Sequence, residues 1–165
     1  MLNPTQIATL RTLVLGESSL AQARNDGNDQ VITDWLNASS TPAFYVYKSV
    51  LTRHSILTET SPDGTVFGWV GALYITRNQG ERDAFREMFN STGSVNPALG
   101  TVQAAFGDIF SGAGGLANRT HILSMSRRVA TRAEKQLAAG AGTAVSPATA
   151  TFEGYVSTGE AGLMR

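Results

Sequence analysis

Apolar residues recur at helical spacing in several stretches of the chain. Near the start, Asn3 is a typical N-cap and Pro4 stands at the first helical position. Apolar side chains follow on one face, and Gly16 is expected to end the helix. Asn78 and Glu81 have the spacing of a capping box at the start of a later stretch. The pattern predicts helices over residues 4–16, 29–36, 79–89, 97–111 and 116–138, with a short polar helix over 18–24.

Two other apolar stretches fit either a helix or a strand. Aromatic residues and valines over 44–51 favour a strand, whereas Pro42 and the paired apolar positions favour a helix slightly, which is the interpretation adopted. The glycine-containing stretch 66–75 is interpreted as helical or irregular. Between them, residues 61–64 (Ser-Pro-Asp-Gly) predict a turn.

The chain loses helical periodicity after residue 139. Residues 140–165 contain many small side chains and look unable to bury a core of their own. The predicted fold is therefore mainly α, with a helical bundle over 1–139 and an extended C-terminal arm over 140–165, although a frayed tail is the alternative. The residues expected to dock this arm on another protein are Val145, Phe152, Glu153, Gly154, Tyr155 and Val156.

Composition excludes several kinds of site. The chain has 165 residues, a formal net charge of zero, no cysteine and two histidines. It therefore has no disulfide framework, no thiolate metal site, no cysteine nucleophile and no three-histidine metal site. A signal peptide and a membrane helix are not expected, which fits synthesis in the cytoplasm.

Charge is distributed unevenly along the chain. Residues 1–110 carry 7 basic and 10 acidic side chains, a net charge of −3, whereas residues 111–165 carry 6 basic and 3 acidic ones, a net charge of +3. A solvated helix face explains such an excess, and so does contact between copies in an assembly. Net neutrality argues against nucleic-acid binding. The candidate contact residues are Arg119, Arg127, Arg128, Arg132 and Lys135.

No catalytic arrangement stands out. The chain lacks a phosphate-binding glycine loop and a nucleophile elbow, and the acidic Glu81 and Asp83 are expected to serve a helix dipole. His54 and His121 are expected on the surface or partly packed. We therefore expect no enzyme activity, no cofactor and no metal.

The stretch 127–157 resembles a C-terminal signature of small tailed-bacteriophage proteins, most specifically over Ala133–Gly154. Further similarity lies in an Asn-Pro-x-Gln-Ile start, an Asp-Gly-rich break before Leu-Asn-Ala, a Tyr-Lys-Ser-Val element and a helix between Val-Asn-Pro and a glycine-rich end. The corresponding ranges are 3–7, 27–38, 47–50 and 95–115. The chain departs from the family pattern at Lys48 and over 66–77.

These proteins are similar to head–tail connectors, also called adaptors. The resemblance implies a ring of about twelve copies beneath the portal protein, the symmetry of a closed head-to-tail oligomer. It also implies contacts with the portal and with a downstream tail or neck protein, genome DNA passing through the lumen without specific binding, and a location at the head–tail junction of the virion. The alternatives are another neck, tail or capsid-associated virion protein and a small helical nucleic-acid-binding regulator.

Overall fold

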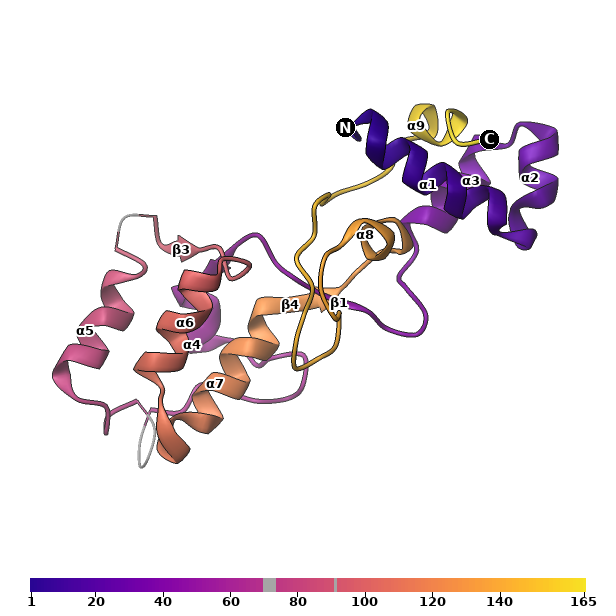
Figure 1. Ribbon diagram of the computed structural model, residues 1–165. Coiled ribbons are helices and arrows are strands. Elements are labelled where there is room, and N and C mark those ends of the chain that lie inside the picture. Colours follow the sequence, from indigo (N-terminus) through magenta and orange to yellow (C-terminus); the bar gives the residue numbers. More distant parts are fainter. Residues whose placement is uncertain (70–73, 91) are drawn as a thin grey trace. The chain divides into compact units, whose positions relative to one another are not determined.

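The computed structural model describes residues 1–69, 74–90 and 92–165, and helices dominate it (Figure 1). The chain forms two compact units. We call residues 1–46 and 129–165 the split unit, and residues 47–128 the inserted unit. The fold is mainly α, as predicted, but the division predicted at residue 139 is wrong, because residues on both sides of it belong to the split unit.

The split unit contains most of the short helices. Helix α9 lies against α3, and α8 lies against α1 (Figure 1). A 3₁₀ turn, Ser18–Leu20, joins the first two helices. The helices are α1 (Pro4–Gly16), α2 (Ala21–Asp26), α3 (Asp29–Asn37), α8 (Arg132–Leu137) and α9 (Thr158–Gly162).

Caps at the helix ends explain where α1 and α3 begin. The Asn3 side chain accepts from the N–H of Gln6 at 2.9 Å, the Gln6 side chain accepts from the N–H of Asn3, and Pro4 follows at the first turn. Gly27 ends α2 with a positive φ of 66°, and Asn28 caps α3. The sequence prediction of these two helices is confirmed.

The inserted unit begins and ends near a pair of short strands, β1 (Tyr45–Tyr47) and β4 (Arg127–Val129). Within it, β2 (Leu51–Thr52) pairs antiparallel with β3 (Ser94–Val95). Its helices are α4 (Arg53–Thr58), α5 (Gln79–Glu87), α6 (Gly100–Ile109) and α7 (Gly112–Ser126). Asn78 and Glu81 form the predicted capping box of α5.

Three sequence predictions need correction. Residues 44–51 form parts of β1 and β2 rather than a helix, in line with the strand preference of their aromatic residues and valines. The helix predicted over 116–138 ends at Ser126 and continues as β4 and α8. Helix α6 begins at Gly100 rather than at residue 97, because the Asn96 side chain closes a turn on the N–H of Ala98. Residues 70–73 of the ambiguous stretch lie outside the described residues.

The predicted C-terminal arm is corrected as well. Phe152, Val156, Ala161 and Met164 are buried in the core of the split unit together with side chains of α1 and α3. Apolar side chains spaced irregularly along this segment reach that core without a helical period, which is why periodicity missed them. Among the described residues, no helix is both long and apolar enough to cross a membrane.

Candidate functional site

The six predicted docking residues divide into buried anchors and exposed positions. Phe152 and Val156 are 8% and 1% exposed and belong to the core. Glu153, Gly154 and Tyr155 lie between them at the surface, and the Tyr155 side chain is 82% exposed. Val145, from the same segment, is 81% exposed. The C-terminal segment thus exposes the side chains of Val145 and Tyr155, while the buried side chains of Phe152 and Val156 anchor it in the core.

Two side chains of the split unit fix the backbone around Tyr155. The Asn37 amide donates to the carbonyl of Val156 and accepts from its N–H, both at 2.9 Å. The buried Glu134 accepts from the N–H of Gly154 at 3.4 Å while it also closes the capping box of α8. The backbone is therefore hydrogen-bonded to side chains on both sides of Tyr155, at Gly154 and at Val156.

The loop that carries Val145 is fixed at its base. Ala139 and Thr149 exchange two backbone hydrogen bonds of 2.9 and 2.8 Å, and the N–H of Ala148 donates to Tyr45 at 2.9 Å. At Gly142, where φ is +65°, a β-carbon would overlap the ring of Phe44. Only glycine fits there, so the loop has a defined path.

Glu160 joins the two ends of the split unit. Burial opposes its ionisation, but hydrogen bonds from the backbone N–H groups of Ser157 and Leu2 and from the Ser157 hydroxyl outweigh this, so its pKa lies below its ordinary value. The carboxylate thereby caps α9 and holds Leu2 at 2.6 Å.

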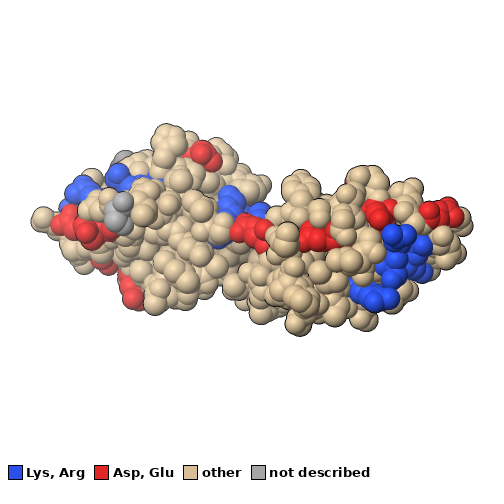
Figure 2. Space-filling view, turned by 90° about the horizontal axis from the view of Figure 1, so that it is seen from above, with Lys and Arg blue, Asp and Glu red and all other residues tan. Residues whose placement is uncertain are grey.

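The five basic residues predicted to make charge contacts do not lie on one helix face. Arg119 is on α7, Arg127 and Arg128 are on β4, and Arg132 and Lys135 are on α8, which belongs to the other unit. On the face drawn in Figure 2, basic and acidic side chains lie near one another among a larger uncharged surface. The five residues must therefore be considered separately.

Arg132 and Lys135 line a pocket of about 370 Å³ within the split unit, together with Glu17 and Trp35. The Arg132 guanidinium lies 4.7 Å from the centre of the Trp35 ring and donates to the Trp35 carbonyl at 3.1 Å. Hydrogen bonds from Ser19 lower the pKa of Glu17, and Arg132 acts in the same direction. This pocket therefore already contains a carboxylate beside its cations.

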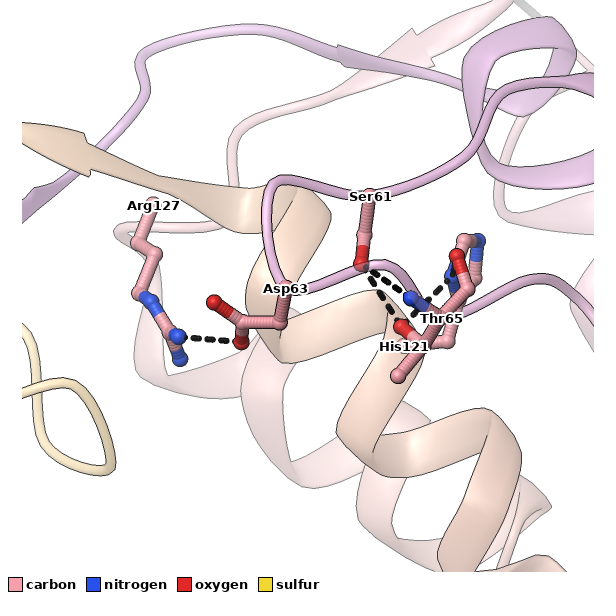
Figure 3. A network of polar contacts seen from close by, with 5 residues as sticks. All are labelled: Ser61, Asp63, Thr65, His121 and Arg127. Carbon is pink, nitrogen blue, oxygen red and sulfur yellow. Dashed lines mark hydrogen bonds and ion pairs between the residues drawn. The ribbon is translucent and has the colours of Figure 1, made fainter.

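Arg127 forms an ion pair with Asp63 of the predicted 61–64 turn, near a second polar network (Figure 3). There the hydroxyls of Ser61 and Thr65 lie 2.7 Å apart, and Thr65 Oγ1 lies 3.2 Å from His121 Nδ1. His121 Nε2 lies 2.8 Å from the carbonyl oxygen of Ile56. Nδ1 also lies 3.1 Å from the Thr65 carbonyl.

The interpretation of His121 as a surface or partly packed residue is wrong, because its side chain is completely buried. It fastens the irregular segment between α4 and residue 68 to α7, as Asn118 also does. The Asn118 amide accepts from the N–H of Gly68 at 2.8 Å and donates to its carbonyl at 3.1 Å. His54, in contrast, is exposed as expected. Nothing in the sequence distinguishes the two histidines, since the contacts of His121 lie 56 and 65 residues away.

This network has no feature of a hydrolytic site. Ser61 reaches the imidazole through Thr65 rather than directly, and the opposite ring nitrogen faces a backbone carbonyl instead of a carboxylate. Within residues 1–69, 74–90 and 92–165, no three His, Asp or Glu side chains lie close enough together to hold a metal ion. The arrangement holds loops together.

An apolar pocket of about 310 Å³ lies within the inserted unit, between α6 and α7. Its walls include Phe106, Leu116, Leu123 and Tyr47, and burial raises the pKa of the Tyr47 hydroxyl. Arg119 also lines it. Its guanidinium donates to the carbonyls of Phe110 and Gly112, between the two helices. Sequence patterns did not indicate this pocket, since α6 and α7 alone do not specify how they pack.

Comparisons with models of protein families, with curated proteins and with solved structures found no match to this chain.

Proposed function

We propose that the protein is a virion structural protein of the head–tail connector class, without catalytic activity. The observation that carries the proposal is the C-terminal segment. It contains the sequence that most resembles these phage proteins, and it holds an exposed aromatic side chain, Tyr155, between the buried anchors Phe152 and Val156. An exposed aromatic ring on a fixed backbone is typical of an interface anchor, because little conformational entropy is lost on binding.

In this proposal about twelve copies form a ring beneath the portal protein, with a tail or neck protein on the other side and genome DNA in the lumen. The contacts come from the exposed positions of the C-terminal segment, Val145 and Glu153–Tyr155, rather than from a detached arm. A cyclic ring needs two different surfaces on each copy. The apolar pocket of the inserted unit offers a second surface of that kind.

A cryo-EM map of the head–tail junction of the native particle tests this proposal. We expect a ring into which the chain can be traced, with residues 142–155 at a contact with a neighbouring chain. If the chain is found elsewhere in the particle, the connector role is wrong and the protein is another neck, tail or capsid-associated protein. Its absence from the particle, together with salt-dependent DNA binding, would overturn the proposal in favour of a nucleic-acid-binding regulator.

A further inference from the structure

The apolar pocket between α6 and α7 contains one cation whose charge is not balanced within the pocket. Arg119 is the only charged side chain among the described residues that line it, and it forms no ion pair with any part of the chain that the structure describes. The pocket of the split unit differs, because Glu17 lies there beside Arg132 and Lys135. The α6–α7 pocket therefore has a positive charge that an entering anion can balance.

The Arg119 guanidinium is held through one of its nitrogen atoms. Nη1 donates to the carbonyls of Phe110 and Gly112, at 3.2 Å for Gly112. The opposite edge carries the parallel N–H groups of Nε and Nη2, and neither has a hydrogen-bond partner among the described residues. Two parallel N–H donors match the two oxygens of a carboxylate. Because the backbone already holds the guanidinium, little side-chain entropy is lost when this edge binds.

The walls of the pocket set the rest of the ligand's chemistry. Phe106, Leu116, Ile122 and Leu123 line it beside Arg119, so most of a bound molecule would contact carbon. A cavity of about 150 Å³ holds a benzene molecule. The volume of about 310 Å³ therefore has room for a ring and a short chain, or for a medium-length alkyl chain.

We propose that the α6–α7 pocket binds a small monocarboxylate whose body is an apolar ring or chain. The apolar body lies against Phe106, Leu116 and Leu123, and the carboxylate accepts hydrogen bonds from Nε and Nη2 of Arg119. This ligand site goes beyond the connector role and does not depend on it. The pocket is also the second contact surface of the connector proposal, so a bound carboxylate competes there with a neighbouring copy.

Titration calorimetry of the full chain with two matched probes tests the site. The probes are 4-phenylbutyrate and its neutral counterpart 4-phenylbutan-1-ol, which differ only in the carboxylate. We expect the acid to bind at least about 10-fold more tightly, because a charged hydrogen-bonded pair forms with Arg119. Added salt should reduce this difference. Equal affinities for the two probes, or no saturable binding of the acid at millimolar concentration, would overturn the inference.

Three variants place the binding in this pocket. Arg119→Gln should remove the preference for the acid and leave the affinity for the alcohol unchanged, which also shows that the pocket is intact. Gly107→Leu should abolish binding of both probes, because Gly107 lines the pocket and no atom lies within 4 Å of its β-carbon position. Gly100→Leu is the matched control, since its β-carbon position in α6 is equally open but does not line the pocket. Acid binding that survives Gly107→Leu would mean that the ligand binds elsewhere.

The ligand site and the connector role can fail separately. If the chain is traced in the ring but 4-phenylbutyrate does not bind, the ligand site is wrong and the connector role stands. In that case, a side chain of a neighbouring copy seen in the pocket would assign it to the subunit contact. If the acid binds with the expected preference but the chain is absent from the particle, the connector role is wrong and the ligand site stands.

Discussion

The split unit and the inserted unit each hold one long irregular segment with an asparagine side chain. Asn37 pairs with both backbone groups of Val156, 119 residues away, and Asn118 pairs in the same way with Gly68, 50 residues away. An amide side chain offers a donor and an acceptor together, so it can take the place of a neighbouring strand. Asn118 is completely buried, whereas Asn37 is half-buried.

The cores of the two units differ in composition. The split unit packs mainly aliphatic side chains, with Phe152 among them. The inserted unit packs aromatic rings, and the centre of the Phe67 ring lies 5.9 Å from that of Phe85 and 6.0 Å from that of Phe110. Rings have fixed shapes and few rotamers, so we expect the inserted unit to tolerate added volume poorly and the split unit to depend most on its single buried ring.

Phe152→Ala should give the largest effect. Removing a buried ring lowers the free energy of unfolding by about 4 kcal/mol, which covers both the lost burial and the cavity left behind. Chemical denaturation measures the loss, and hydrogen exchange should place it in residues 1–46 and 129–165. Tyr155→Ala is the matched control and should change stability by at most about 0.5 kcal/mol, because its ring is exposed. Equal losses would mean that the segment is not anchored as described.

Gly115→Ala tests the tight packing of the inserted unit. A β-carbon at Gly115 would overlap the backbone carbonyl of Phe110, so the turn between α6 and α7 would have to shift, at a cost of about 3 kcal/mol. Gly107→Ala in α6 is the control, since nothing lies near its β-carbon position, and it should be neutral or stabilise by about 0.5 kcal/mol. Exchange protection lost outside residues 47–128 would contradict the contrast between the units.

The contrast also shows which parts of the fold the sequence could predict. Helices with local caps, such as α1 with Asn3 and α5 with Asn78, follow from residues three or four positions apart. The turn over 61–64 likewise follows from residues close together in the sequence. The break of the predicted 116–138 helix at Ser126 depends on a distant segment, because residues 127–129 pair with a strand from the first third of the chain.

The candidate site was predictable to a similar extent. Sequence reasoning selected residues 152–156 but treated all of them as docking residues, because periodicity does not reveal which irregularly spaced side chains reach a core. Burial separates Phe152 and Val156 from Tyr155. The pocket that Arg119 lines arises from the packing of α6 on α7, and no local sequence pattern predicts that packing.

The two asparagines give the most direct comparison between the units. Asn118→Ala should cost about 2 to 3 kcal/mol, because it leaves the N–H and the carbonyl of Gly68 without their side-chain partner next to an aromatic core. Asn37→Ala should cost about 1 to 2 kcal/mol, because water can reach its half-buried position. The exposed Asn90→Ala is the control for both. A larger loss for Asn37→Ala, measured by thermal denaturation, would reverse the ranking.

The smallest expected effect is a pH dependence confined to the split unit. The pKa of Glu160 is lowered in the folded protein, so its carboxylate contributes stability above its unfolded pKa of about 4.5, and this contribution is lost as the pH falls through the folded pKa. Glu160→Gln should therefore lower the melting temperature at pH 7 and flatten its decline below pH 4.5. Glu59→Gln, an exposed residue of the inserted unit, should leave the profile unchanged. The melting temperature of Glu160→Gln could still fall below pH 4.5 as it does in the wild type. In that case the hydrogen bonds from Ser157 and Leu2 do not depend on the charge of this carboxylate, and the core around α9 alone holds the two chain ends together.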